Sequence, residues 1–150
     1  MTTEKIEAIK KPSAALVTQI VAALTAANYS LQIVNLILQR NLISSSIFWP
    51  SIVISVIISA ASIFTIVAIQ KPSPTAKIIA SVYLWFMLIG YPFYMYLGRI
   101  GYYVPAPEIS NEELAGAAIA EGLRYAVFLA LIVWVGLSKR FTIYAKQNTA

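Results

Sequence analysis

The sequence contains no cysteine and no histidine among its 150 residues. Without cysteine the chain has no disulfide bonds and no thiolate metal ligands, and without histidine it has no imidazole ligands and no Ser-His or Cys-His catalytic pair. Charged residues are also scarce, at 11%, against about 25% in a typical soluble domain. We therefore expect no metal site, no cofactor and no catalytic residues in this chain.

Apolar residues take the place of the missing charges. They make up 59% of the chain, and the mean hydropathy is +0.76. Soluble domains are about 45–50% apolar. The composition excludes a soluble globular protein and predicts a protein embedded in a membrane.

Four apolar stretches cover residues 14–38, 47–69, 76–98 and 117–138 approximately. Each is long enough for a transmembrane helix, which needs about 20 residues. The stretches are apolar on nearly every side and do not alternate as barrel strands do, and lipid offers no partner to an unpaired backbone group. The sequence therefore predicts an all-α integral membrane protein, with four transmembrane helices in an antiparallel bundle, as one domain over residues 1–150 that ends in a short C-terminal tail.

Two short motifs predict where helices begin. In the turn after the second stretch, Ser73 can cap the third helix and Pro74 can occupy its first position, where a missing N–H does no harm. Ser110 and Glu113 match a capping box, which starts the fourth helix directly after Ser110 and before its apolar part. The longest connection, residues 99–116, is predicted to lie outside the cell.

The basic residues predict an orientation. Eight fall on one side of the predicted membrane and two on the other, which places both termini in the cytoplasm of a multi-pass cell-membrane protein. The eight are Lys5, Lys10, Lys11, Lys71, Lys77, Lys139, Arg140 and Lys146, and the two are Arg40 and Arg99. They flank the spans and form no patch with stacking aromatics, so the expected partners are membrane lipids and other integral membrane subunits or copies of this chain, and not nucleic acid.

The first apolar stretch carries a mainly polar seam. Its members recur at intervals of three and four, which puts them on one helical face. They are Thr18, Val21, Thr25, Asn28, Gln32, Asn35 and Gln39. Amides exposed to lipid would be unpaired, so the seam must face protein or water. It either lines a hydrated pathway or makes interhelical hydrogen bonds, and the second reading is favoured because none of these side chains can ionise.

The second and fourth stretches carry small residues at helical spacing. The serine stripe consists of Ser51, Ser55, Ser59 and Ser62, and the glycine-alanine seam consists of Gly122, Ala126 and Ala130. Small residues at such intervals let helices approach closely in a membrane. Because a short connection joins the first two stretches, we expect the serine stripe to contact the polar seam. The glycine-alanine seam is a second predicted contact, with another helix or another subunit.

Glu121 and Arg124 are the ionisable residues of the fourth stretch. Three residues apart on a helix, they can form an ion pair. An ionisable residue inside a span is a candidate for proton coupling or for ligand binding. Both residues lie near the outer end of the helix, where their charged groups can reach water, so we expect an ion pair rather than a coupling site.

The sequence contains no phosphate loop, nucleotide fingerprint or nucleophile elbow. The leading hypothesis is a non-catalytic integral subunit that packs in and stabilises a larger membrane complex, for example an energy-transducing or respiratory one. The alternative is a small homo-oligomeric transporter or channel, in which the polar seam lines the path and Glu121 with Arg124 binds or couples.

Overall fold

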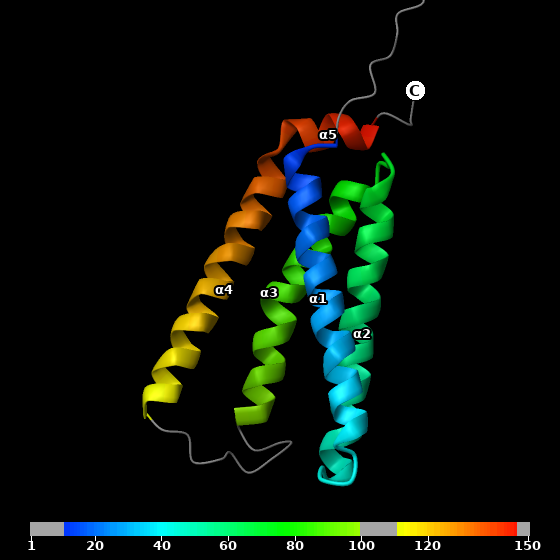
Figure 1. Cartoon of the computed structure of the whole chain (residues 1–150). Helices are drawn as coiled ribbons and strands as arrows, with labels where there is room; N and C mark the ends of the chain where they lie inside the picture. The colour runs from blue at the N-terminus through cyan, green and yellow to red at the C-terminus, as the bar shows by residue number, and fades with distance from the viewer. Residues whose placement is uncertain (1–10, 100–110, 147–150) are drawn as a thin grey trace, which may run out of the picture.

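A computed structural model describes residues 11–99 and 111–146, apart from the side chains of residues 91–99, 111–114 and 117. Over these residues the chain forms five helices and no strand (Figure 1). The helices are α1 (Ser13–Leu38), α2 (Ser45–Gln70), α3 (Ala76–Arg99), α4 (Asn111–Leu137) and α5 (Lys139–Lys146). The prediction of an all-α protein is confirmed.

Three of the helices are long and apolar enough to cross a membrane: α1, α2 and the segment Ala118–Leu137 of α4. The apolar part of α3 that the described residues cover, Ala76–Gly90, is shorter than a full span. The fourth crossing and the orientation of the chain therefore stay predictions.

The four long helices run alternately in opposite directions, and α5 lies across one end of them (Figure 1). At this end the beginnings of α1 and α3 meet the ends of α2 and α4. The most extensive contact in the described chain joins α1 to α2, and α4 contacts α3 more than α1. Away from α5, α4 diverges from the other helices (Figure 1).

The helix starts follow local hydrogen bonding. The Ser73 hydroxyl accepts the N–H of Thr75 at 3.2 Å, but the helix begins at Ala76 and not at Pro74. The reason is that the Ala76 N–H bonds the Ser73 carbonyl at 3.0 Å, as in a tight turn, and the first α-helical bond runs from Ile79 to Thr75 at 2.8 Å. Pro74 therefore lies in the turn that leads into α3.

Helix α4 begins at Asn111, where the capping box predicts its start. Ser110 lies outside the described residues, and the side chain of Glu113 is not described. Of the predicted loop 99–116, Arg99 ends α3 and residues 111–116 are helical, while residues 100–110 lie outside the described chain.

Helix α5 replaces the C-terminal tail that the sequence predicts. The Ser138 hydroxyl accepts the N–H of Phe141 at 3.2 Å, which is the bond of an N-cap residue. Ser138 is the one residue between the end of α4 and the start of α5. Phe141, Tyr144 and Ala145 are buried on one face of α5. A short helix that is amphipathic in this way is stable only when its apolar face packs on the bundle.

Tyr144 ties α5 to the end of α2. Its hydroxyl donates to the carbonyls of Ile69 at 3.4 Å and Gln70 at 3.3 Å. These carbonyls belong to the last turn of α2, which has no helical N–H left to bond them. Burial raises the pKa of Tyr144 above its ordinary value, so the hydroxyl stays protonated and remains a donor at neutral pH.

Lys77 ties the beginning of α3 to α4 and α5. Its ammonium group donates to the Gly136 carbonyl at 2.9 Å and to the Thr142 hydroxyl at 2.8 Å. A cation at the carbonyl end of a helix is favourable because it meets unpaired carbonyls and the negative end of the helix dipole. Helices α2, α3, α4 and α5 are thus joined at this end.

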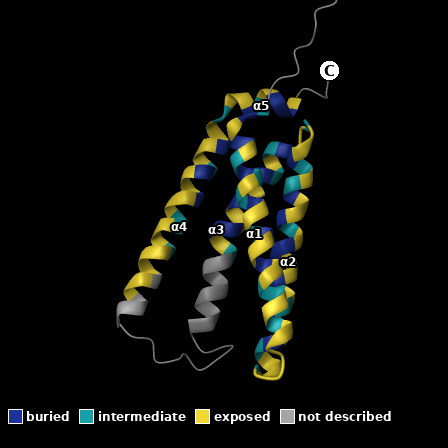
Figure 2. Cartoon of the chain, in the orientation of Figure 1, coloured by how far each residue is buried: buried dark blue, intermediate teal, exposed yellow. Residues whose placement is uncertain are grey.

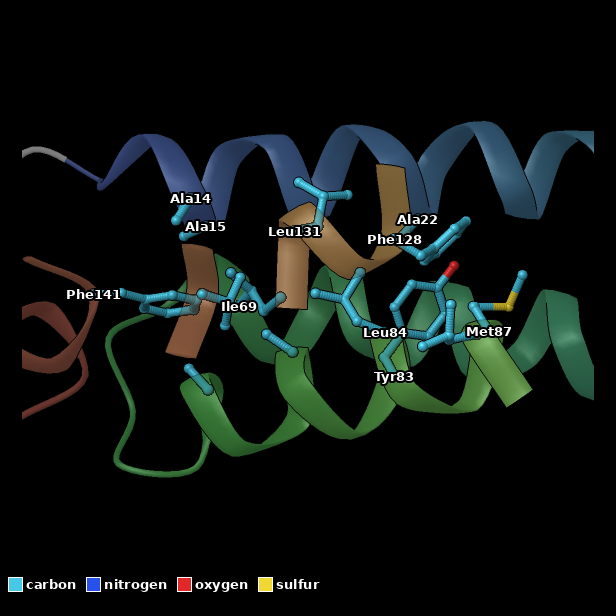
Figure 3. Packing of buried hydrophobic residues seen from close by; sticks show 14 of the residues in the cluster. Ala14, Ala15, Ala22, Ile69, Tyr83, Leu84, Met87, Phe128, Leu131 and Phe141 are labelled. Atoms are coloured by element: carbon cyan, nitrogen blue, oxygen red, sulfur yellow. The ribbon is translucent and has the colours of Figure 1, made fainter. Parts of the chain in front are cut away.

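The hydrophobic core occupies the half of the molecule next to α5. Its large, fully buried side chains include Val135 of α4. They also include Ile69, Leu84 and Phe141, which come from α2, α3 and α5 (Figure 3). The half farther from α5 has few buried residues on α4 (Figure 2).

The packing of α5 predicts the effect of removing its main buried side chain. Phe141→Ala should lower the free energy of unfolding by about 3–5 kcal/mol, because Phe141 is fully buried and the change leaves a cavity. Thermal unfolding in detergent measures this loss. Ile143→Ala, on the exposed face of α5, is the control and should change stability little. Equal losses from both variants would contradict the docked position of α5.

Candidate functional site

Hydrogen bonds between α1 and α2 come from residues next to the predicted polar seam. The Gln19 amide donates to the Ile66 carbonyl at 2.9 Å, and Lys11 donates to the Gln19 side-chain oxygen at 2.8 Å. Farther along, the hydroxyls of Ser30 and Ser59 are 3.1 Å apart. Ser59 of the serine stripe therefore bonds α1 through Ser30, which lies beside the predicted polar seam and is not a member of it.

The residues of the polar seam differ in how far this chain buries their side chains. Thr25 and Gln32 are half-buried, while Asn28 and Asn35 are exposed on the surface of this chain. Within the described residues, the two asparagines thus have room for contacts with something other than this chain.

The faces of α1 and α2 that are buried consist largely of small residues. On α2 these are the serine stripe, Ser51, Ser55, Ser59 and Ser62, and on α1 they include Ala15, Ala22 and Ala26. Small side chains permit the closest approach of two helix backbones. Alanine therefore occupies the contact face of α1, and the longer amides lie at its rim.

Tyr83 of α3 connects the seam to the serine stripe. Its hydroxyl is 3.0 Å from the hydroxyl of Ser62, and the side chain of Thr25 lies next to it. Figure 3 shows the buried ring extending from α3 toward α1. The three hydroxyls join α1, α2 and α3 in the interior.

Glu121 and Arg124 lie on the face of α4 that turns toward the other helices. The residues that follow on this face at intervals of four, three and four are Phe128, Leu131 and Val135, all buried. The Arg124 Nη2 donates to the Glu121 Oε1 at 2.7 Å, so the two form a close ion pair. The predicted pair is present, on the inner side of α4.

A crevice of about 280 Å³ lies beside Arg124, between α1, α3 and α4. Its lining consists of Leu24, Thr25, Asn28, Tyr29, Met87, Arg124 and Phe128. A hydroxyl, an amide and a guanidinium face a mainly apolar wall, which suits a small polar or anionic group. Among the described residues, no group of three or more His, Cys, Asp or Glu lies close enough together to hold a metal ion.

The glycine-alanine seam of α4 faces away from the rest of the chain. Gly122 and Ala126 are exposed, and a Cβ atom built on Gly122 would meet no heavy atom within 4 Å. Of the side chains described between residues 115 and 127, none is buried (Figure 2). This stretch of α4, which we call the outer half, has an unpartnered face in the described chain.

Comparisons with protein-family models, with curated proteins and with solved structures found no match. The function is therefore inferred from the polar groups and from the uncovered surface of this chain.

The sequence analysis missed the contacts of Tyr83, Lys77 and Gln19. Tyr83 does have a signal, since it lies on the same helical face as Ala76 and Ala80, and a tyrosine on an apolar face usually finds a partner for its hydroxyl. Lys77 and Gln19 have no such signal, because each bonds a backbone carbonyl of a helix distant in sequence, and any residue type can supply that partner.

The contact between Ser62 and Tyr83 predicts that these two positions are energetically coupled. In a double-mutant cycle, Ser62→Ala and Tyr83→Phe should show a coupling of about 0.6 kcal/mol, and no more than about 1.7, as measured for hydrogen bonds inside membranes. Unfolding in mixed detergent micelles measures it. Ser62→Ala combined with Tyr144→Phe should be additive, because no contact joins those residues. Additivity in both cycles would refute the Ser62–Tyr83 contact.

Proposed function

We propose that this chain is a non-catalytic integral subunit of a larger protein complex in the cell membrane. In this proposal all four long helices cross the membrane and both termini are cytoplasmic. The observation that carries the proposal is the polar and small-residue surface that the chain leaves uncovered on α1 and α4.

The exposed amides of α1 are the first support. Asn28 lies near the middle of α1 and Asn35 lies two turns farther along, and both are exposed in this chain. In hydrocarbon, an amide without a hydrogen-bonding partner is costly. Asn35 lies outside the crevice that Asn28 lines, so a polar group from another polypeptide is the partner that suits it best.

The outer half of α4 is the second support. This segment is helical, yet it has no buried side chain among those described, and the surroundings of Gly116 and Gly122 are open. Glycine and alanine at these spacings serve close helix contacts, which give little advantage against lipid alone. A neighbouring helix seated here would bury the seam.

The distribution of charge supports the orientation. Lys11, Lys71, Lys139, Arg140 and Lys146 all lie in segments at the α5 end of the bundle. Basic residues next to spans favour the cytoplasmic side. The α5 end is accordingly the cytoplasmic end in this proposal.

The alternative function is that of a small homo-oligomeric transporter or channel. The crevice favours it, since Thr25, Asn28 and Arg124 offer polar groups beside α4 at a depth that a substrate could reach. In that case Glu121→Gln should abolish transport while the protein assembles normally, because the amide keeps the shape of the carboxyl group and removes its titration.

The proposal is tested by the mass of the particle extracted from native membranes. We expect different polypeptides in fixed ratio, and Asn35→Leu should weaken their association about threefold, the equivalent of one intramembrane hydrogen bond of about 0.6 kcal/mol. Ile37→Leu, an exposed apolar position on the same helix, is the control and should have no effect.

A pure homo-oligomer in native membranes would overturn the subunit proposal in favour of the alternative. A monomer that is unaffected by either substitution would overturn both functions.

A further inference from the structure

A second hollow lies between α3 and α5, on the other side of α3 from the contacts that Tyr83 makes. It is a groove of about 400 Å³, and its lining includes Lys77, Ile78, Val82, Trp85, Thr142 and Lys146. The first four belong to α3 and the last two to α5. The groove therefore joins an amphipathic end helix to the side of a long helix.

The two ends of the groove differ in chemistry. Near α5 lie the Lys77 and Lys146 ammonium groups and the Thr142 hydroxyl, and along α3 lie Ile78, Val82 and Trp85. These three α3 side chains are between 47% and 62% exposed on the surface of the chain. Such a site suits a ligand with one anionic end and one long apolar end.

No acidic side chain within the described part of the chain contacts Lys77. Its contacts at 2.9 Å and 2.8 Å are to a carbonyl and a hydroxyl, both uncharged, and an ammonium group has three hydrogens to donate. Glu121 is the one acidic side chain that the structure describes, and it lies on α4 several turns from α5. Among the described residues, no acid therefore offsets the charge of Lys77 at this end of the groove.

We infer that this groove binds one anionic membrane lipid. Its phosphate accepts hydrogen bonds from the ammonium groups of Lys77 and Lys146, and one acyl chain lies along Ile78, Val82 and Trp85. Lysines near the cytoplasmic surface attract anionic headgroups, and the apolar wall of α3 next to them suits an acyl chain. The inference rests on α3 crossing the membrane, as proposed above, and does not depend on a partner subunit.

A lipid fits the groove better than a free phosphate ion does. A phosphate ion would occupy only the lysine end and would leave the three exposed apolar side chains of α3 without a role. An acyl chain packs along that apolar wall while its headgroup meets the lysine end.

Native mass spectrometry of the delipidated protein in detergent provides the test, with phosphatidylglycerol and phosphatidylcholine as probes. We expect one phosphatidylglycerol to bind at least about fivefold more tightly than phosphatidylcholine, and Lys146→Gln to remove about that factor. Lys139→Gln is the matched control, because Lys139 is an exposed lysine of the same helix outside the groove. Lys77 is left intact because it also holds the end of α4.

The position of the chain is tested by fluorescence. In a Trp49→Phe, Trp134→Phe protein, phosphatidylglycerol with brominated chains should quench Trp85, and inorganic phosphate should neither quench it nor displace the lipid. Equal binding of the two lipids, equal losses from Lys146→Gln and Lys139→Gln, displacement by phosphate, or an unquenched Trp85 would each overturn the inference. These measurements detect bound lipid and not protein partners. A negative result would therefore overturn the lipid site without bearing on the subunit proposal.

Discussion

In hydrocarbon, a polar group that finds no partner in protein has no water to bond instead, and this constraint decides how the helices of this chain meet. The backbone satisfies it by forming helices. Several hydroxyls satisfy it within their own helix, as Thr18 does with the Ala14 carbonyl and Thr65 with the Ala61 carbonyl, both at 2.8 Å. The groups that remain must find partners on other helices, and their positions determine the contacts between helices.

Among the described residues, most of the bonds from these remaining groups to other helices lie next to α5. Next to α5, Lys77, Tyr144 and Gln19 all bond carbonyls of distant helices. Farther from α5, Asn28 and Asn35 are exposed and the outer half of α4 has no buried side chain among those described. Well-packed helices at the α5 end would let the chain fold by itself. The uncovered surface at the other end would then be available for contact with another subunit, as in the proposed function.

Hydropathy was sufficient to predict the long helices, because a run of apolar residues has few alternatives to a helix in lipid. The rotation of each helix was harder to predict. Periodicity places Asn28 and Asn35 on one face of α1, but the choice of contact face depends on alanines that pack against the serines of α2.

Helix α5 was missed because it is short and polar by composition, and its stability comes from Phe141 and Tyr144 packing on distant helices. Side-chain bonds to distant carbonyls, such as those of Lys77, leave no periodic pattern in a sequence.

We propose that another polypeptide covers the outer half of α4, and site-specific photo-crosslinking in native membranes can detect that polypeptide. A photoreactive residue in place of Leu123, which is 64% exposed on this segment, should form an adduct with a discrete polypeptide. The same residue in place of Ile57, which is 52% exposed on α2 and lies about as many residues from the α5 end, should label lipid alone. Labelling of lipid alone from both positions would contradict the account.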